Sequence, residues 1–376
     1  MKKRILFLTG TRADFGKLKP LINSVKNNEQ FEYQVFVTGM HLLSKYGNTV
    51  NEIHKSGFNE AFCYMNQVEG EAMEVVLANT ITGLSRYLHE HPVDMIIVHG
   101  DRIEALAGAT VGALRNILVT HIEGGEISGT VDELMRHAIS KLSHIHFVAS
   151  QVAEKRLHQL GEDPKTVFTI GSPDVDVMLS NQLPSLNEAK ERYFIPFDNY
   201  AIAMLHPVTT EYDNQRNHAE IFVESLIESK QNFIVVYPNN DYGSQLIFDA
   251  YKRLEGLDNI KLFPSLRFEH FLVLLKHAHF LIGNSSAGIH EAPIYGVPTI
   301  NIGSRQNNRF RYESIIDVNF DKIEILDAAS SFKEYTRFSP CTYYGDGKSA
   351  EKFISALSSH VWDIANQKYF RDLDNV

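Results

Sequence analysis

A short acidic stretch, HIEGGEISGTVDELMR at residues 121–136, carries three carboxylates that could do chemistry: Glu123, Glu126 and Asp132. A further carboxylate, Asp101, follows an aliphatic run earlier in the chain. Carboxylates held close together raise the pKa of at least one of them, and such a group can exchange protons with a substrate. The structural alternative is that these acids serve as helix caps and surface salt bridges.

Two predicted strands position the first two of these acids. The aliphatic runs at 95–98 and 117–120 end just before Asp101 and Glu123 respectively. If both strands belong to one parallel sheet, the two acids emerge at the same edge. That edge, outside the carboxyl ends of the strands, is where open α/β folds bind ligands.

A predicted helix positions Asp132. Thr130 and Glu133 have the spacing of a capping box, and an apolar helical pattern then runs to about residue 142. An acid in the first turn of a helix is favoured in its ionised form by the helix dipole. We therefore predict that Asp132 acts as a base rather than an acid, with Arg136 one turn further on as a possible partner.

The remaining pattern alternates strands with helices, which predicts βαβ units and parallel sheets. A polar stretch with four prolines at 164–196 interrupts the alternation, which then restarts. We predict an α/β protein with two doubly wound, Rossmann-like domains and a cleft between them. The first domain is placed at 1–172 and the second at 173–359, and a terminal helix is expected at about 349–367.

Two glycine-containing loops could bind an anion, although neither GxGxxG nor GxxxxGK[ST] occurs in the sequence. The first, at 10–16, follows a predicted strand, carries Arg12, and precedes a predicted helix that begins at Lys17. The second, at 283–288, contains Ser285 and Ser286 before a helix predicted at 288–295, whose N-terminus suits a phosphate. The alternative for the first loop is a tight turn with two solvated cations, and the second loop on its own is better explained as a well-capped helix. Glu291, further along that helix, is placed where a carboxylate could bind the hydroxyls of a ribose.

Composition limits the possible partners. The net charge of −10 disfavours nucleic acid, and two distant cysteines fit a reducing cytoplasm. No apolar run approaches the ~20 residues of a membrane span, and the run near residue 5 is too short for a signal peptide. The seventeen histidines show no metal-ligand spacing, so we predict no metal and no cofactor. His206, which ends the first strand of the second domain, is expected to face the cleft.

Six ordered motifs give the sequence a resemblance to a known family. They are GTRADFGKL (10–18), HGDR (99–102), HIEGGEISGTVDE (121–133) with Arg136, GNSSAGIHEA (283–292), GSRQ (303–306) and YGDG (344–347). Together they resemble the UDP-N-acetylglucosamine 2-epimerases. The forms GTRAD and HIEGGE resemble the hydrolysing branch found in sialic acid pathways.

The resemblance implies a GT-B-like fold, in which a C-terminal helix, here at about 360–376, packs back on the first domain. It implies conversion of UDP-N-acetylglucosamine and water to N-acetylmannosamine and UDP, through elimination to 2-acetamidoglucal and hydration. It also implies a cytoplasmic homodimer or higher homo-oligomer. The residues that match the family's catalytic positions are Asp101, Glu123, Asp132 and His206. Those that match its substrate-binding positions are Arg12, Lys17, Arg136, Ser285, Ser286, Glu291 and Arg305.

Some alternatives stay open at this point. The stretch at 307–312, NNRFRY, departs from the family pattern, which leaves the same reaction on UDP-2,4-diacetamido-2,4,6-trideoxyglucose as an alternative. A GT-B glycosyltransferase and a nucleotide-sugar-binding protein without turnover are the other candidates. Uracil recognition is expected from backbone groups near 263–268. Which acid removes the C2 proton is not assigned by the sequence.

Overall fold

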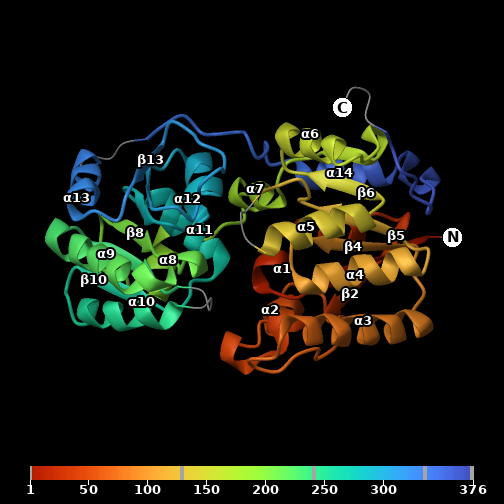
Figure 1. Ribbon diagram of the computed structural model, residues 1–376, viewed down its shortest axis with the longest axis horizontal. Coiled ribbons are helices and arrows are strands. Elements are labelled where there is room, and N and C mark those ends of the chain that lie inside the picture. The colour runs from red at the N-terminus through yellow and green to blue at the C-terminus, as the bar shows by residue number, and fades with distance from the viewer. Residues whose placement is uncertain (1, 128–130, 239–242, 333–336, 373–376) are drawn as a thin grey trace. The chain divides into compact units, whose positions relative to one another are not determined.

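The computed structural model describes residues 2–127, 131–238, 243–332 and 337–372. The chain forms two compact units (Figure 1). The first contains Met1–Leu179 and Tyr343–Val376, and the second contains Ser180–Thr342. Each unit holds one parallel sheet with helices between successive strands, as the alternating pattern predicts.

The described part of the first unit contains a seven-stranded sheet in the order β3-β2-β1-β4-β5-β6-β7. Its strands are β1 (Lys3–Thr9), β2 (Phe31–Val37), β3 (Phe62–Cys63), β4 (Met95–His99), β5 (Leu118–Ile122), β6 (Ile145–Val148) and β7 (Val167–Thr169). Its helices are α1 (Arg12–Lys26), α2 (Val50–Lys55), α3 (Met73–Glu90), α4 (Ile103–Leu114), α5 (Val131–Leu142), α6 (Gln151–Gln159), α7 (Pro173–Met178) and α14 (Ser349–Leu357).

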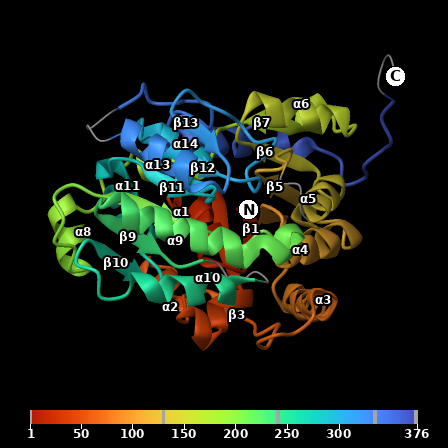
Figure 2. The ribbon, with the colours of Figure 1, turned by 60° about the vertical axis from the view of Figure 1, so that its left-hand side comes forward.

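Both faces of this sheet are buried, as a parallel sheet requires. Alternate side chains of β1 enter two different cores: Ile5 and Phe7 join the core that includes side chains of α1 and α14. Leu6 and Leu8 join the core formed with α3 and α4, which lie side by side in Figures 1 and 2. The aliphatic run in β1 therefore reflects burial on both sides.

Helix α1 begins earlier than the sequence predicts. The stretch 10–16 was expected to be a loop, but the helix starts at Arg12 with Thr11 as its N-cap. Thr11 and Asp14 form a capping box, in which Asp14 takes the place of the more usual Glu. Gly10 and Gly16 favoured the prediction of a loop, although Thr11 and Asp14 have the spacing of a helix cap. At the other predicted capping box, Thr130 lies outside the described residues, and α5 is described from Val131.

The segment that returns to the first unit differs from the predicted terminal helix. Helix α14 ends at Leu357, and a 3₁₀ turn, η7 (His360–Asp363), follows. Phe353, Leu357 and Val361 fill the core beside α1. Residues 364–372, where the C-terminal helix was expected, form no helix. The first unit includes α7. Asp176 of this helix accepts hydrogen bonds from the backbone of Ser349 and Ala350 at the start of α14.

Residues beyond η7 bind the end of α5. The Lys368 ammonium donates to the carbonyl of Ser143 (2.6 Å) and to Glu162 Oε2 (2.5 Å). Glu162 is almost fully buried and also binds Lys141 (2.8 Å) and His146 (3.0 Å). Burial alone would raise the pKa of Glu162, but His146, Lys368 and Lys141 outweigh it and lower that pKa to about 2. A lysine at this position also complements the negative end of the helix dipole.

The described part of the second unit contains a six-stranded parallel sheet in the order β10-β9-β8-β11-β12-β13. Its strands are β8 (Ala201–Met204), β9 (Phe233–Val236), β10 (Ile260–Phe263), β11 (Leu281–Gly283), β12 (Thr299–Ile302) and β13 (Ile315–Val318). Its helices are α8 (Leu186–Arg192), α9 (Gln215–Ser229), α10 (Ser244–Tyr251), α11 (Phe268–His277), α12 (Ala287–His290) and α13 (Lys322–Ser331). Figures 1 and 2 both show α9 lying along α10. Within the described ranges, no helix has the length and apolar character needed to cross a lipid bilayer.

Candidate active site

Asp101 and Glu123 emerge at the same edge of the first sheet, as predicted. Strands β4 and β5 are parallel neighbours, with His99 opposite Ile122. The backbone N–H of Gly100 donates to the Ile122 carbonyl at 3.0 Å, which continues the pairing past the strand end. Asp101 comes two residues after the end of β4, and Glu123 comes directly after the end of β5, so both acids lie just beyond neighbouring strand ends.

Glu123 is held by three side chains. Its Oε2 lies 2.7 Å from Lys17 Nζ and 3.0 Å from His99 Nε2, and its Oε1 accepts a hydrogen bond from Ser172 Oγ at 2.5 Å. Burial would raise the pKa of Glu123, but Lys17 and His99 outweigh it and hold the pKa well below its usual range. Glu123 is therefore not the acid whose pKa neighbouring carboxylates raise, because Lys17 and the hydrogen bond with His99 outweigh its burial.

The backbone of Glu123 adopts a left-handed conformation, with φ of +61°. A residue with a Cβ pays roughly 1–2 kcal/mol for this conformation. The backbone N–H is fixed by a 2.8 Å hydrogen bond to the Phe147 carbonyl of β6. The sheet thus keeps a strained backbone that turns the carboxylate toward Lys17.

Asp174 is a buried acid that the sequence analysis did not single out. Asp174 belongs to α7 and comes two residues after Ser172. Its Oδ2 lies 3.2 Å from Lys17 Nζ. Burial raises the pKa of Asp174 and the charge of Glu123 adds to this effect, while Lys17 opposes it. The available signal was the polar turn that follows the strand at 167–169, the same pattern that marked Asp101 and Glu123.

Asp101 is paired with Arg136. The guanidinium Nη2 binds Asp101 Oδ2, and Nη1 donates to the carbonyl of Glu126 at 3.1 Å. Arg136 is buried on α5, and Asp132 lies half-buried in the first turn of the same helix. The spacing along the helix predicts Asp132 as a possible partner of Arg136, and the structure shows that Arg136 binds Asp101 on a different element.

A neutral histidine supports the loop before Asp101. His121 is fully buried, and its ring nitrogens lie 2.7 Å from the Gly100 carbonyl and 3.0 Å from Ser140 Oγ. Burial lowers the pKa of His121 to about 3, so the ring carries no charge at neutral pH. It therefore acts as a hydrogen-bonding spacer between β5, α5 and the Gly100 turn.

In the second unit, Asn284 organises the ends of β8 and β11. Its Oδ1 accepts from the His206 backbone N–H at 2.6 Å, and its Nδ2 donates to the His206 carbonyl at 2.8 Å. The carbonyl of Asn284 accepts from Arg305 Nη1 (3.2 Å) and from Gln306 Nε2 (2.8 Å). Gly283 has a φ of +133°, and a Cβ there would lie 1.9 Å from the Met204 carbonyl oxygen, so only glycine fits.

The helix predicted after the second loop is shorter than expected. Helix α12 ends at His290, and a 3₁₀ turn, η6 (Ala292–Tyr295), follows around Pro293. Ser285 is buried and accepts from the Ala287 N–H at 3.3 Å, while Ser286 is the N-cap residue. Helix α12 is only one turn long, so its dipole is small. The candidate for binding an anion is therefore the set of backbone N–H groups at Ser285–Ala287 and not the helix dipole. Glu291 lies half-buried between α12 and η6.

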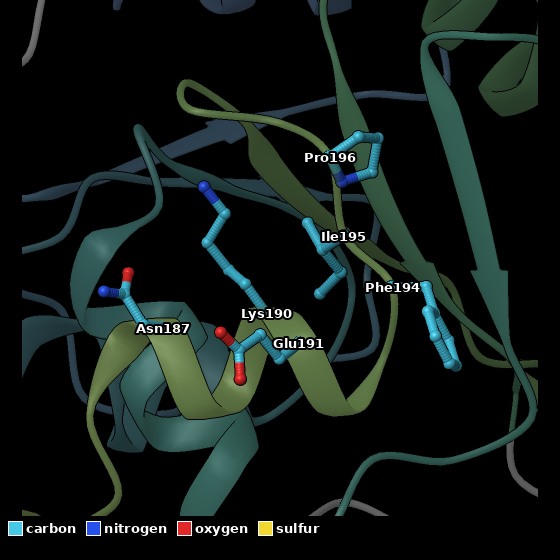
Figure 3. A pocket seen from close by; sticks show the side chains of 6 residues that line it. All are labelled: Asn187, Lys190, Glu191, Phe194, Ile195 and Pro196. Carbon is cyan, nitrogen blue, oxygen red and sulfur yellow. The ribbon is translucent and has the colours of Figure 1, made fainter.

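Further predicted substrate contacts belong to other elements. Arg12, half-buried at the start of α1, forms an ion pair with Glu52 at 3.0 Å. The segment 263–268 joins β10 to α11 and contacts Tyr193, whose hydroxyl accepts from the Arg267 N–H at 2.8 Å. A hollow beside α8 contains none of the candidate residues (Figure 3). It is lined by Asn187, Lys190, Glu191, Phe194, Ile195 and Pro196. No group of three or more His, Cys, Asp or Glu among the described residues is placed to hold a metal ion.

Comparison with known proteins identifies the family. A family model described as UDP-N-acetylglucosamine 2-epimerase matches residues 23–358. A UDP-N-acetylglucosamine 2-epimerase of Neisseria meningitidis serogroup B is 49% identical over 376 residues, covering 99% of this chain and 100% of the relative. The chain belongs to the UDP-N-acetylglucosamine 2-epimerase family. Asp101, Glu123, Asp132 and His206 all lie within the matched range, whereas Arg12 and Lys17 precede it.

A further relative matches nearly the whole chain, and a solved structure shares its fold. A Legionella pneumophila protein named UDP-N,N'-diacetylbacillosamine 2-epimerase (hydrolyzing) is 33% identical over 96% of each chain. A crystal structure of a UDP-GlcNAc 2-epimerase from Neisseria meningitidis bound to UDP-GlcNAc matches with a TM-score of 0.79 at 17% identity. That match covers 94% of this chain and 99% of the other. The predicted GT-B-like α/β fold is thereby confirmed.

Proposed function

We propose that the protein is a hydrolysing UDP-N-acetylglucosamine 2-epimerase, which converts UDP-N-acetylglucosamine and water to N-acetylmannosamine and UDP. Family membership and the 49% identical Neisseria relative support the substrate class. The Legionella relative, named as hydrolysing, supports release of the free sugar. The structural observation that carries the proposal is Glu123, a buried and ionised carboxylate beside Lys17 and His99.

The first step is an elimination, and we assign its base to Glu123. The carboxylate takes the proton from sugar C2, and the C2–H electron pair forms the C1=C2 double bond. The C1–O bond breaks with its electron pair going to the diphosphate, which leaves 2-acetamidoglucal and UDP. A base must be unprotonated when it acts, and the low pKa of Glu123 keeps it so.

The second step is a hydration. A water oxygen bonds to C1 and gives up one proton to a basic residue of the site. The electron pair of the C1=C2 double bond takes a proton from an acidic residue at C2, on the face opposite the one that was deprotonated, which inverts C2. Asp101, Asp132 and His206 are the remaining residues that we assign to acid–base roles in the two steps. The ion pair with Arg136 keeps the Asp101 carboxylate in one orientation.

The second unit supplies our proposed contacts to UDP. Arg305 provides a positive charge, and the turn at Ser285 and Ser286 provides backbone N–H groups for the diphosphate. Glu291 can accept hydrogen bonds from the two ribose hydroxyls. In the first unit, Arg12, Lys17 and Arg136 remain proposed substrate contacts. Lys17 also forms the ion pair with Glu123. We further propose a cytoplasmic homo-oligomer that supplies N-acetylmannosamine for sialic acid or a related sugar.

A second candidate substrate is a UDP-2,4-diacetamido-trideoxy sugar. The name of the Legionella relative favours it, although that relative shares less of the sequence than the Neisseria protein does. A 6-methyl group would require an apolar pocket. The divergent stretch at 307–312 instead places Arg309 near His290 (3.5 Å) and Arg311 on Asp317 (2.8 Å). We therefore rank UDP-N-acetylglucosamine first.

A proton NMR time course in deuterated water tests the proposal. With UDP-N-acetylglucosamine, we expect free N-acetylmannosamine carrying deuterium at C2, together with UDP. Formation of UDP-N-acetylmannosamine would instead indicate a non-hydrolysing epimerase. UDP release that depends on an added acceptor would indicate a glycosyltransferase. If neither UDP-N-acetylglucosamine nor the diacetamido sugar reacts, the proposal is wrong.

A further inference from the structure

Lys17 lies between two carboxylates, of which Asp174 is buried and Glu123 is largely buried. Its Nζ is 2.7 Å from Glu123 Oε2 and 3.2 Å from Asp174 Oδ2. Asp174 is 8% exposed, and the side chain of Glu123 is 12% exposed. Screening by water is weak at such sites, so each carboxylate is strongly affected by how the ammonium is shared.

The three residues come from separate elements that pack together. Lys17 projects from α1, Glu123 follows β5, and Asp174 belongs to α7, which packs against α1. Ser172, just before α7, donates to the other oxygen of Glu123. The start of α7 thus binds Glu123 through Ser172 and binds the lysine of Glu123 through Asp174.

We infer that Asp174 is a positioning residue of the proposed reaction: it draws part of the Lys17 charge away from Glu123 and so keeps Glu123 basic enough to accept the C2 proton. This inference rests on the proposed function, because it requires Glu123 to be the base. A carboxylate that receives the whole charge of a lysine is a weaker base, and proton transfer then slows.

The charge state of Asp174 decides how Lys17 is shared. When Asp174 is protonated, Lys17 interacts chiefly with Glu123. When Asp174 is ionised, the ammonium is divided between the two oxygens. Among the described residues, His99 of β4 is a further titratable group that faces Asp174. Asp176, on the same helix, is bound to the start of α14 by the backbone of Ser349 and Ala350.

The pH dependence of the Asp174→Asn variant tests the inference. Asparagine has the shape of a protonated aspartate and no charge, so the variant should match the wild type where Asp174 is protonated. As pH rises and wild-type Asp174 ionises, the ratio of wild-type to variant kcat/KM should grow above one, toward a limit of about 10 set by roughly one pKa unit on the base. A ratio of one throughout, or a ratio that does not change with pH, would overturn the inference.

Asp176→Asn is the matched control, because it removes a carboxylate from the same helix without touching Lys17. Its loss of the bonds to α14 should lower the melting temperature, while any change in kcat/KM should be independent of pH. A pH-dependent ratio like that of Asp174→Asn would mean that the effect comes from general loosening of α7. That result would count against a positioning role for Asp174.

A second measurement does not depend on turnover. Carbon-13 NMR of labelled aspartate can follow the Asp174 carboxyl, assigned by its loss in Asp174→Asn. In Glu123→Gln the full Lys17 charge falls to Asp174, so its pKa should drop by about one unit. An unchanged titration would show that the two acids do not share Lys17. This outcome is distinct from failure of the proposed function, which appears as an inactive wild type.

Discussion

The carboxamide of Asn284 binds both backbone groups of His206, accepting from its N–H at 2.6 Å and donating to its carbonyl at 2.8 Å. Asn284 itself is 1% exposed and follows β11, the neighbour of β8 in the sheet. The backbone of His206 is therefore fixed by a side chain that follows a different strand of the sheet.

Replacing Asn284 by Leu should destabilise the second unit and reduce turnover. The substitution leaves two backbone groups of His206 unpaired, at a cost of about 2–3 kcal/mol. In a unit of this size, we expect the melting temperature to fall by roughly 5–10 °C, measured by calorimetry. Asn259→Leu removes a hydrogen bond to Gln231 in the same unit and is the control. It should reduce stability without a comparable loss of kcat, and an equal loss in both variants would contradict the role of Asn284.

Glu123→Gln should lower kcat by about 10²-fold or more, the usual effect of losing a general base. The amide keeps the shape of the side chain but accepts no proton. Binding of UDP, measured by calorimetric titration, should persist. The exposed Glu29→Gln provides the comparison and should behave as wild type. Near-normal turnover in Glu123→Gln would remove Glu123 from the reaction.

Asp132→Asn should also reduce turnover by about 10²-fold, since we assign it an acid–base role. The substitution keeps a good hydrogen-bonding group in the first turn of α5, so stability should change little. Glu133→Gln, the next residue, is the natural comparison. If both variants lose activity equally, the effect belongs to the start of α5 and not to the chemistry of Asp132.

Arg305→Ala should weaken UDP binding by about 10- to 100-fold, as expected when a charged hydrogen bond is lost. Ser285→Ala should act in the same direction with a smaller effect. Isothermal titration with UDP measures both. Arg253→Ala, which removes an exposed arginine paired with Glu224, should leave the dissociation constant unchanged. An unchanged constant for Arg305→Ala would refute its assignment.

Glu162→Gln should remove a pH-dependent part of the stability. The folded-state pKa of Glu162 is lowered from 4.5 to about 2. Its contribution is therefore present above about pH 4.5 and is lost as pH falls toward 2. Urea unfolding should show the variant less stable than wild type at neutral pH, with the two converging in acid. The exposed Glu90→Gln should follow wild type, and a difference that does not depend on pH would contradict the linkage.

Local sequence patterns correctly predicted the positions of Asp101 and Glu123, because these positions depend only on where a strand ends. A buried strand that ends in a polar residue places that residue at a sheet edge, and this holds for Asp101 and Glu123. The partners of these acids were not predictable in the same way. Arg136 binds Asp101 from 35 residues away, and Lys17 binds Glu123 from 106 residues away.

Two errors have identifiable causes. The start of α1 was misplaced because Gly10 and Gly16 suggested a loop, although Thr11 and Asp14 had the spacing of a cap. Asp174 was not predicted as a site residue because Pro173 was interpreted as part of a domain boundary. The structure shows Pro173 at the first position of α7, where proline is common. The boundary itself depends on Asp176 and α14, a contact between distant residues that no local pattern reveals.

The first unit is interrupted in sequence by the whole of the second, and this has a consequence for synthesis. A ribosome completes residues 180–342 before it makes Phe353, Leu357 and Lys368, which fill the first core and bind the end of α5. Domains generally fold as units while the chain is made. The second unit should thus reach its native state before the helix α14 that completes the core of the first unit has been synthesised.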